Sequence, residues 1–192
     1  MGALRSFFVD GCVCAHFLLQ FLERGRIMNK KARLLAHGAL IGALYVVLCH
    51  FQNLLLPNSA TMAIQFRAAE ALCVLAFFTP AAVPGLTVGC FLFNLTFAGA
   101  LPTDVVVGPI ASFMAAVSMR WLRKWPWLGM LMPAIWNAIL VGWELTVYVG
   151  DGFWINALYV AIGEAAVLLT LGAALYGVMK RHLGSRLFDT VS

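Results

Sequence analysis

The sequence predicts an all-α integral membrane protein with six transmembrane helices and with both termini in the cytoplasm. Hydrophobic residues make up 62% of the 192 residues and charged residues only 11%. The mean hydropathy is +0.90. A soluble domain of this length needs far more charge to cover its surface. The apolar residues also form long runs separated by short polar breaks, which is typical of membrane helices.

Six apolar runs, each of roughly 20 residues, are long enough to cross a bilayer, and together they leave no room for a soluble enzymatic domain. Pro80 ends the second run, and Pro84 lies in the first turn of the third, where proline is tolerated. The predicted spans are Leu34–Leu56, Met62–Thr79, Ala81–Ala98, Thr103–Leu122, Leu128–Val149 and Phe153–Met179.

Lysine and arginine predict the orientation, because they collect in the cytoplasmic flanks of membrane helices. With six spans, three clusters fall on one side, whereas the opposite loops 57–61, 99–102 and 150–152 contain neither residue type. An odd number of spans would break this agreement. Short clusters of this kind anchor helices in an anionic leaflet, so the net charge of +5 does not indicate nucleic-acid binding. The clusters are Lys30, Lys31 and Arg33; Arg120, Arg123 and Lys124; and Lys180, Arg181 and Arg186.

Residues 28–183 form the predicted six-helix membrane domain, and residues 184–192 a cytoplasmic tail. Residues 1–27 are an N-terminal extension without the basic, apolar and small-residue order of a cleaved signal peptide. Met28 directly precedes a basic cluster and the first span, so we interpret it as the natural start. The alternative is that residues 1–27 form a short amphipathic segment on the membrane surface.

We predict no catalytic site, metal site or cofactor. The serines lack a Gly-x-Ser-x-Gly context, and the histidines and acids do not form a recognised metal set. The five cysteines indicate neither a disulfide framework nor a zinc site, because three of them lie inside apolar runs and the other two lack the further ligands that zinc requires. They are Cys12, Cys14, Cys49, Cys73 and Cys90.

Ionisable residues within predicted spans carry the functional signal, because charge inside a bilayer costs at least a few kcal/mol. At about 1.5 Å per residue, none of the five falls in the cytoplasmic half of its span. Two asparagines extend the group, and a polar pocket that opens outward is the natural inference. The residues are Arg67, Glu70, Asp104, Glu144 and Glu164, with Asn94 and Asn137.

Structural alternatives exist for several of these residues. Arg67 and Glu70 can neutralise each other at a spacing of three residues, and Asp104 can stabilise a helix N-terminus. Glu144 and Glu164 have no obvious basic partner, and for these two we favour contact with a ligand. Trp143 can stack on a flat ligand or belong to an interfacial aromatic belt.

Small residues line the first span. Gly38 and Gly42, like Ala39 and Ala43, are spaced four apart, which lets another helix approach closely. The neighbouring helix is either part of this chain or part of a partner subunit.

The segment from Gln65 to Leu72 resembles the Q-F-R-x-x-E-A-L signature of the QueT family, the substrate-binding S components of energy-coupling factor (ECF) transporters. The resemblance covers roughly residues 28 to 179, although Ala69 stands where the family favours serine. It adds Gln65 to the polar residues and Trp143 discussed above. The predicted set is Gln65, Arg67, Glu70, Asn94, Asp104, Asn137, Trp143, Glu144 and Glu164.

The resemblance also implies a mechanism and partners. An S component of this kind lies in the cell membrane, captures a vitamin-like solute and associates with a transmembrane coupling subunit and two ATPase subunits. The sequence contains no phosphate-binding loop of its own. The family is linked to queuosine precursors, which are 7-deazaguanine compounds, and Ala39, Ala43, Gly38 and Gly42 become the expected docking surface. A corrinoid substrate and a stand-alone small-solute transporter are the alternatives.

Overall fold

The computed structural model describes residues 30–56, 67–150 and 152–183, and within these ranges the chain is all helical. Gln65 and the N-terminal extension, for which we made predictions, lie outside the described residues. The elements are α2 (Lys30–Leu55), the 3₁₀ helix η2 (Ala68–Phe77), α3 (Ala82–Thr96), α4 (Asp104–Trp121), α5 (Pro126–Met130), α6 (Met132–Val149), α7 (Phe153–Val167), the π-helical turn η3 (Leu168–Gly172) and α8 (Ala173–Leu183).

Three of these helical stretches are long and apolar enough to cross a membrane: 30–55, 126–148 and 153–181. Two shorter helices, η2 and α3, are also apolar. The outer surface agrees with this assignment, because large hydrophobic side chains such as Leu35, Leu54 and Trp154 are 76 to 82% exposed. Lipid is the environment that tolerates such a surface. The chain is therefore a multi-pass membrane protein.

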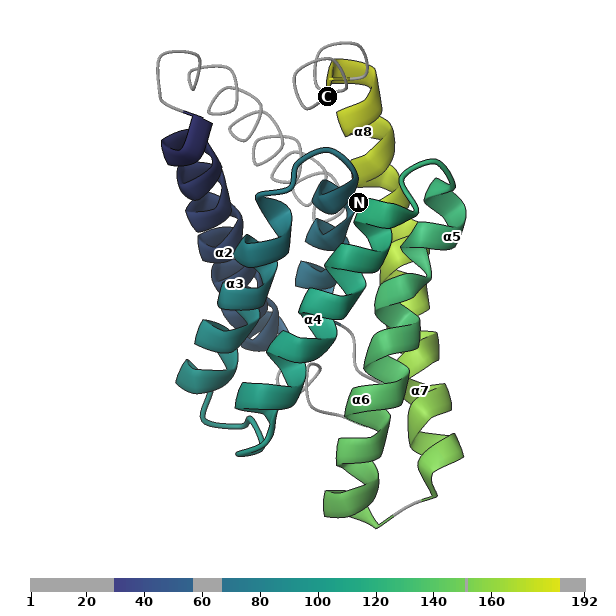
Figure 1. Ribbon diagram of the computed structural model, residues 1–192. Coiled ribbons are helices and arrows are strands. Elements are labelled where there is room, and N and C mark those ends of the chain that lie inside the picture. Colours follow the sequence, from purple (N-terminus) through teal and green to yellow (C-terminus); the bar gives the residue numbers. More distant parts are fainter. Residues whose placement is uncertain (1–29, 57–66, 151, 184–192) are drawn as a thin grey trace.

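The bundle has two ends, which we name after the ends of α4. At the Asp104 end α4 begins and α2 and α6 finish, whereas at the Trp121 end α4 finishes and α2 begins (Figure 1). Successive long elements run in opposite directions between these ends, and α8 finishes at the Trp121 end with the start of α2 (Figure 1).

The second predicted span differs most from the expectation of an ordinary α-helix. Residues 68–77 wind as a 3₁₀ helix, and the chain from Ala69 to Phe77 is buried throughout. A 3₁₀ helix rises about 2 Å per residue, so these ten residues cover about 20 Å of a hydrocarbon core about 30 Å thick. The Ala68 amide donates to the Gln52 Oε1 atom of α2 over 2.6 Å, which satisfies one N–H group at the start of the helix.

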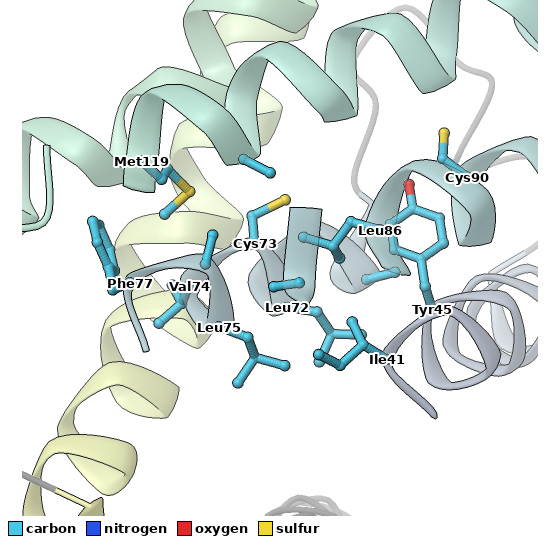
Figure 2. Packing of buried hydrophobic residues seen from close by; sticks show 14 of the residues in the cluster. Ile41, Tyr45, Leu72, Cys73, Val74, Leu75, Phe77, Leu86, Cys90 and Met119 are labelled. Carbon is cyan, nitrogen blue, oxygen red and sulfur yellow. The ribbon is translucent and has the colours of Figure 1, made fainter. Parts of the chain in front are cut away.

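Side chains from α2, α3, α4, α5 and α8 pack with those of η2 in the hydrophobic core, part of which Figure 2 shows. Val74 and Phe77 of η2 lie toward Met119, and Leu72 lies toward Ile41 of α2 (Figure 2). Because this element is covered by protein on every side, its backbone does not need the regular α-helical bonding of a lipid-facing span.

Two other spans are less uniform than predicted. The fifth is divided into α5 and α6, with Pro133 in the first turn of α6. Proline has no backbone N–H to continue the preceding helix, so a new helix begins there. The sixth continues from α7 through η3 into α8, and Gly172 in the π-helical turn faces Val74 of η2.

Glycines decide how closely α2 and α3 approach. A Cβ atom on Gly85 would lie 2.6 Å from the Gly38 carbonyl oxygen, and one on Gly42 would lie 2.9 Å from the Gly85 carbonyl oxygen. Gly89 is in the same position against Gly42. The small residues of α2 therefore divide into two sets: the glycines pack inside the bundle, whereas Ala39 and Ala43 are exposed.

Candidate ligand-binding site

Five ionisable side chains are buried inside the described part of the bundle, at most 5% exposed each, and they come from four elements. Burying charge in an apolar interior is costly unless the groups are paired, hydrogen-bonded or neutralised. Such a cluster in a membrane protein is by default a candidate functional site. The residues are Arg67 and Glu70 at η2, Asp104 on α4, Glu144 on α6 and Glu164 on α7.

Both oxygens of the Glu70 carboxylate are occupied by partners in the protein. Tyr45 of α2 donates its hydroxyl to Glu70 Oε1 over 2.7 Å, and the Cys73 thiol donates to Oε2 over 3.1 Å. Tyr45 is completely buried, and its hydroxyl points toward Cys90 of α3 (Figure 2). Glu70 therefore ties η2 to α2 and has a structural role even without a ligand.

Arg67 and Glu164 lie close to Glu70. Arg67 interacts electrostatically with Glu70 and with Asp104. Glu164 interacts with both Glu70 and Arg67. A single buried guanidinium thus stands among several carboxyl groups, which limits how far it can neutralise each of them.

Asp104 closes the loop between α3 and α4. Its Oδ2 atom accepts a hydrogen bond from the Leu101 backbone N–H over 2.8 Å, and its carbonyl oxygen accepts one from Asn94 Nδ2 over 2.6 Å. Gly108, one turn further along α4, leaves room for the Asn94 amide, which a Cβ atom there would overlap. The Asp104 carboxylate therefore holds the loop that precedes α4, and it also interacts with Glu144.

Glu144 receives a hydrogen bond from the Thr103 hydroxyl on Oε1, and its other oxygen, Oε2, is unpaired. Glu164 Oε2 also has no hydrogen-bond partner, and the same is true of one buried atom on each of α3, α4 and α6 besides Glu144 Oε2. The further atoms are Asn94 Oδ1, Ser112 Oγ and Asn137 Nδ2.

These unpaired atoms are the most informative feature of the site. Most buried polar atoms in folded proteins are hydrogen-bonded, and each exception costs about 1–3 kcal/mol. Here five exceptions come from four helices, α3, α4, α6 and α7. The orientation of the Asn94 amide is set by its bond to the Asp104 carbonyl, so its unpaired oxygen is a true acceptor. The arrangement suits a polar molecule bound between these helices.

The structure gathers most of the predicted site residues but not all of them. Trp143 is 60% exposed on the outside of α6, so it is not part of the buried cluster, although its neighbour Glu144 is. The residues that lie buried as predicted are Arg67, Glu70, Asn94, Asp104, Asn137, Glu144 and Glu164.

Sequence reasoning missed the hydroxyl-bearing residues of the cluster. Tyr45 and Thr103 donate their hydroxyls to Glu70 and Glu144, and Ser112 adds a buried hydroxyl. One signal was present: a tyrosine in the middle of an apolar span needs a partner for its O–H group. Among the described residues, no group of three histidines, cysteines or acids could hold a metal ion.

An all-helical bundle with an apolar surface and a buried, incompletely paired polar site defines a multi-pass membrane protein equipped to hold a polar solute. A comparison with protein-family models matches the QueT transporter family over residues 35–181, well over half of the chain. The chain belongs to the QueT transporter family, and it is not an enzyme. Searches of curated proteins and of solved structures found no significant match.

Proposed function

We propose that this chain is the substrate-capture subunit of an ECF-type importer and that its substrate is a queuosine precursor of the 7-deazaguanine type. The observation that carries the proposal is the group of unpaired polar atoms buried between α3, α4, α6 and α7 in a member of the QueT family. A guanine-like edge presents adjacent N–H donors, which a carboxylate accepts as a pair. Glu144 and Glu164, each with one unpaired oxygen, are the proposed acceptors.

The proposal is tested by the affinity of the purified protein for a ligand panel. We expect the wild-type chain to bind a 7-deazaguanine compound with measurable heat in calorimetry and to be stabilised against thermal unfolding by it, because a ligand that binds only the folded state raises the unfolding temperature. A corrinoid serves as the comparison ligand. If the chain binds the corrinoid but no deazaguanine compound, the proposed substrate is wrong. If it binds neither ligand, the proposal is overturned.

For the orientation, we propose six crossings with both termini in the cytoplasm, so that the Asp104 end faces outside. The basic clusters support this orientation, because Lys30 and Lys31 open α2 while Arg123 and Lys124 follow α4, all at the Trp121 end (Figure 1). Exposed tryptophans accompany the second cluster, as expected for an interfacial belt. They are Trp121, Trp125 and Trp127, between 68 and 82% exposed.

Single cysteines test this orientation in a background without the native ones. We expect an impermeant thiol reagent added to intact cells to label Leu101→Cys and not Arg123→Cys, since the positive-inside rule places the second position in the cytoplasm. Arg123→Cys should become reactive once the membrane is permeabilised, which provides the control. Labelling of Arg123→Cys in intact cells would reverse the topology.

The proposed partners are a transmembrane coupling subunit and two ATPase subunits, which would supply the energy that this chain does not. The glycines of α2 pack against α3, and the face of α2 that carries Ala39 and Ala43 remains exposed. Small residues on an exposed helix face allow a helix of another subunit to approach closely. This face is therefore the proposed docking surface.

A further inference from the structure

A histidine lies on the exposed surface of α2, within the predicted span Leu34–Leu56 and outside the buried polar cluster. His50 is exposed, and the large apolar side chains before and after it along this surface, Val47 and Leu54, are 60 and 77% exposed. This part of α2 therefore faces the hydrocarbon of the bilayer. A polar, ionisable side chain is costly there, and by default it indicates a function.

The hydrogen bonds around the His50 ring fix its tautomer. Its Nε2 atom lies 3.0 Å from the hydroxyl oxygen of Thr96 on α3. That hydroxyl has a single proton, which it donates to its own helix, with the Leu92 and Phe93 carbonyl oxygens at 2.7 and 3.2 Å. It therefore accepts its further hydrogen bond from the His50 Nε2–H group. A neutral imidazole protonated at Nε2 carries a lone pair on Nδ1, and no described residue donates to that atom.

An aromatic contact holds the His50 ring in place. Phe93 of α3 is completely buried, and its ring packs against His50 with the centroids 5.1 Å apart and the planes at 71°. Together with the hydrogen bond to Thr96, this contact fixes the ring between α2 and α3. The Nδ1 acceptor is therefore preorganised, and a donor that reaches it meets little cost for ordering the side chain.

His50 lies in line with the two alanines of the proposed docking surface. At about 100° per residue, position 50 of the helix projects within about 20° of both Ala39 and Ala43. It lies seven residues, about 10 Å, beyond Ala43 along the axis. A second helix that packs on the alanines at an ordinary crossing angle of about 20–40° stays within reach of a side chain two turns away. The same face of α2 thus offers close approach at one level and a hydrogen-bond acceptor at another.

We infer that His50 is the polar contact of the docking surface and that the helix of the coupling subunit presents a neutral donor, a hydroxyl or an amide, to its Nδ1 atom. This inference rests on the proposed function. Lipid tails offer no donor, so an unpaired acceptor on this face is unfavourable in the free subunit, and docking removes that cost. A hydrogen bond also requires one level along the helix, so His50 sets the register of docking, which small residues alone leave open.

Two substitutions of His50 separate its nitrogens, and they are tested in the full chain with the purified coupling module. Asparagine places its polar atoms near the Nδ1 position of a histidine, whereas glutamine places them near the Nε2 position. We expect His50→Gln to weaken assembly with the module about threefold to tenfold, the effect of one hydrogen bond, and His50→Asn to assemble like the wild type. Both variants should keep the substrate affinity of the free subunit, because His50 lies outside the polar cluster.

The opposite result, in which His50→Asn loses assembly and His50→Gln keeps it, would show that only the bond to Thr96 matters and would overturn the inference. Equal effects in the two variants, including none, would overturn it as well. A change in self-association in place of assembly would assign this face to a second copy of the chain. Ala43→Trp distinguishes the two levels of failure: if this variant also assembles normally, the proposed docking surface itself is wrong.

Discussion

Replacement of Glu164 by glutamine is expected to weaken binding of the 7-deazaguanine substrate by about ten- to a hundred-fold. The substitution keeps the shape of the side chain but places an N–H donor where an acceptor is needed. Donors of the bound ligand then remain unpaired in a buried site, which costs about 1–3 kcal/mol. Because Glu164 Oε2 has no hydrogen-bond partner in the protein, the folded state without ligand loses little. Calorimetric titration measures the affinity, and the unfolding temperature measures the stability.

Glu70→Gln is the matched comparison, since the same chemical change is made at a carboxylate whose oxygens are already bonded to Tyr45 and Cys73. Here the new amide meets a donor of the protein itself, so the variant should unfold at a lower temperature, with a loss of about 1–3 kcal/mol. If Glu164→Gln binds the substrate as tightly as the wild type, Glu164 is not an acceptor for the ligand. If both variants lose only stability, the unpaired oxygen of Glu164 has no role in binding.

Replacement of Ala43 by tryptophan is expected to abolish uptake while the purified subunit keeps its affinity for substrate within about twofold, as for a surface change away from the site. Ala43 is exposed on α2, whereas the side chains of the polar cluster are buried. A bulky side chain there blocks the close helix approach that a coupling subunit requires. Uptake in cells that supply the coupling module, together with co-purification of that module, measures the effect.

The neighbouring position gives the contrast. Gly42→Leu should destabilise the subunit itself, because even a Cβ atom at this position lies 2.9 Å from the Gly85 carbonyl oxygen. Overpacking of this kind costs about 1–3 kcal/mol or more. The two adjacent substitutions thus separate docking from folding. Loss of substrate affinity in step with uptake in Ala43→Trp would show that this face supports the binding site and is not a docking surface.

Most residues of the polar cluster could be predicted from the sequence, because a charge inside an apolar run is costly wherever it lies. Glu144 and Glu164 could be selected without a structure for this reason, and both are buried. Trp143 could not be separated from them, since aromatic residues are stable both in lipid and beside a ligand. Its direction depends on the rotation of α6, which sets Glu144 inward and Trp143 outward.

The small residues of α2 show the same division. Their spacing predicted close helix packing, but the identity of the neighbouring helix depended on how α2 and α3 cross. The contacts of Gly38 and Gly42 with Gly85 and Gly89 assign the glycines to the interior, and only the alanines remain exposed. The 3₁₀ conformation of η2 could not be predicted from the sequence either, because it depends on burial of that segment by neighbouring helices.

The sequence by itself determined that this protein lies in a membrane and that it is helical. It also predicted that the few polar residues within the spans, which are costly to expose to lipid, face the interior of the bundle. These properties follow from composition and from the cost of charge in hydrocarbon, which act on each residue wherever its neighbours lie. Only the tertiary structure decided which carboxylates are already paired and which have a free oxygen. Hydrogen bonding depends on contacts between residues far apart in the chain, such as Tyr45 with Glu70 and Thr103 with Glu144.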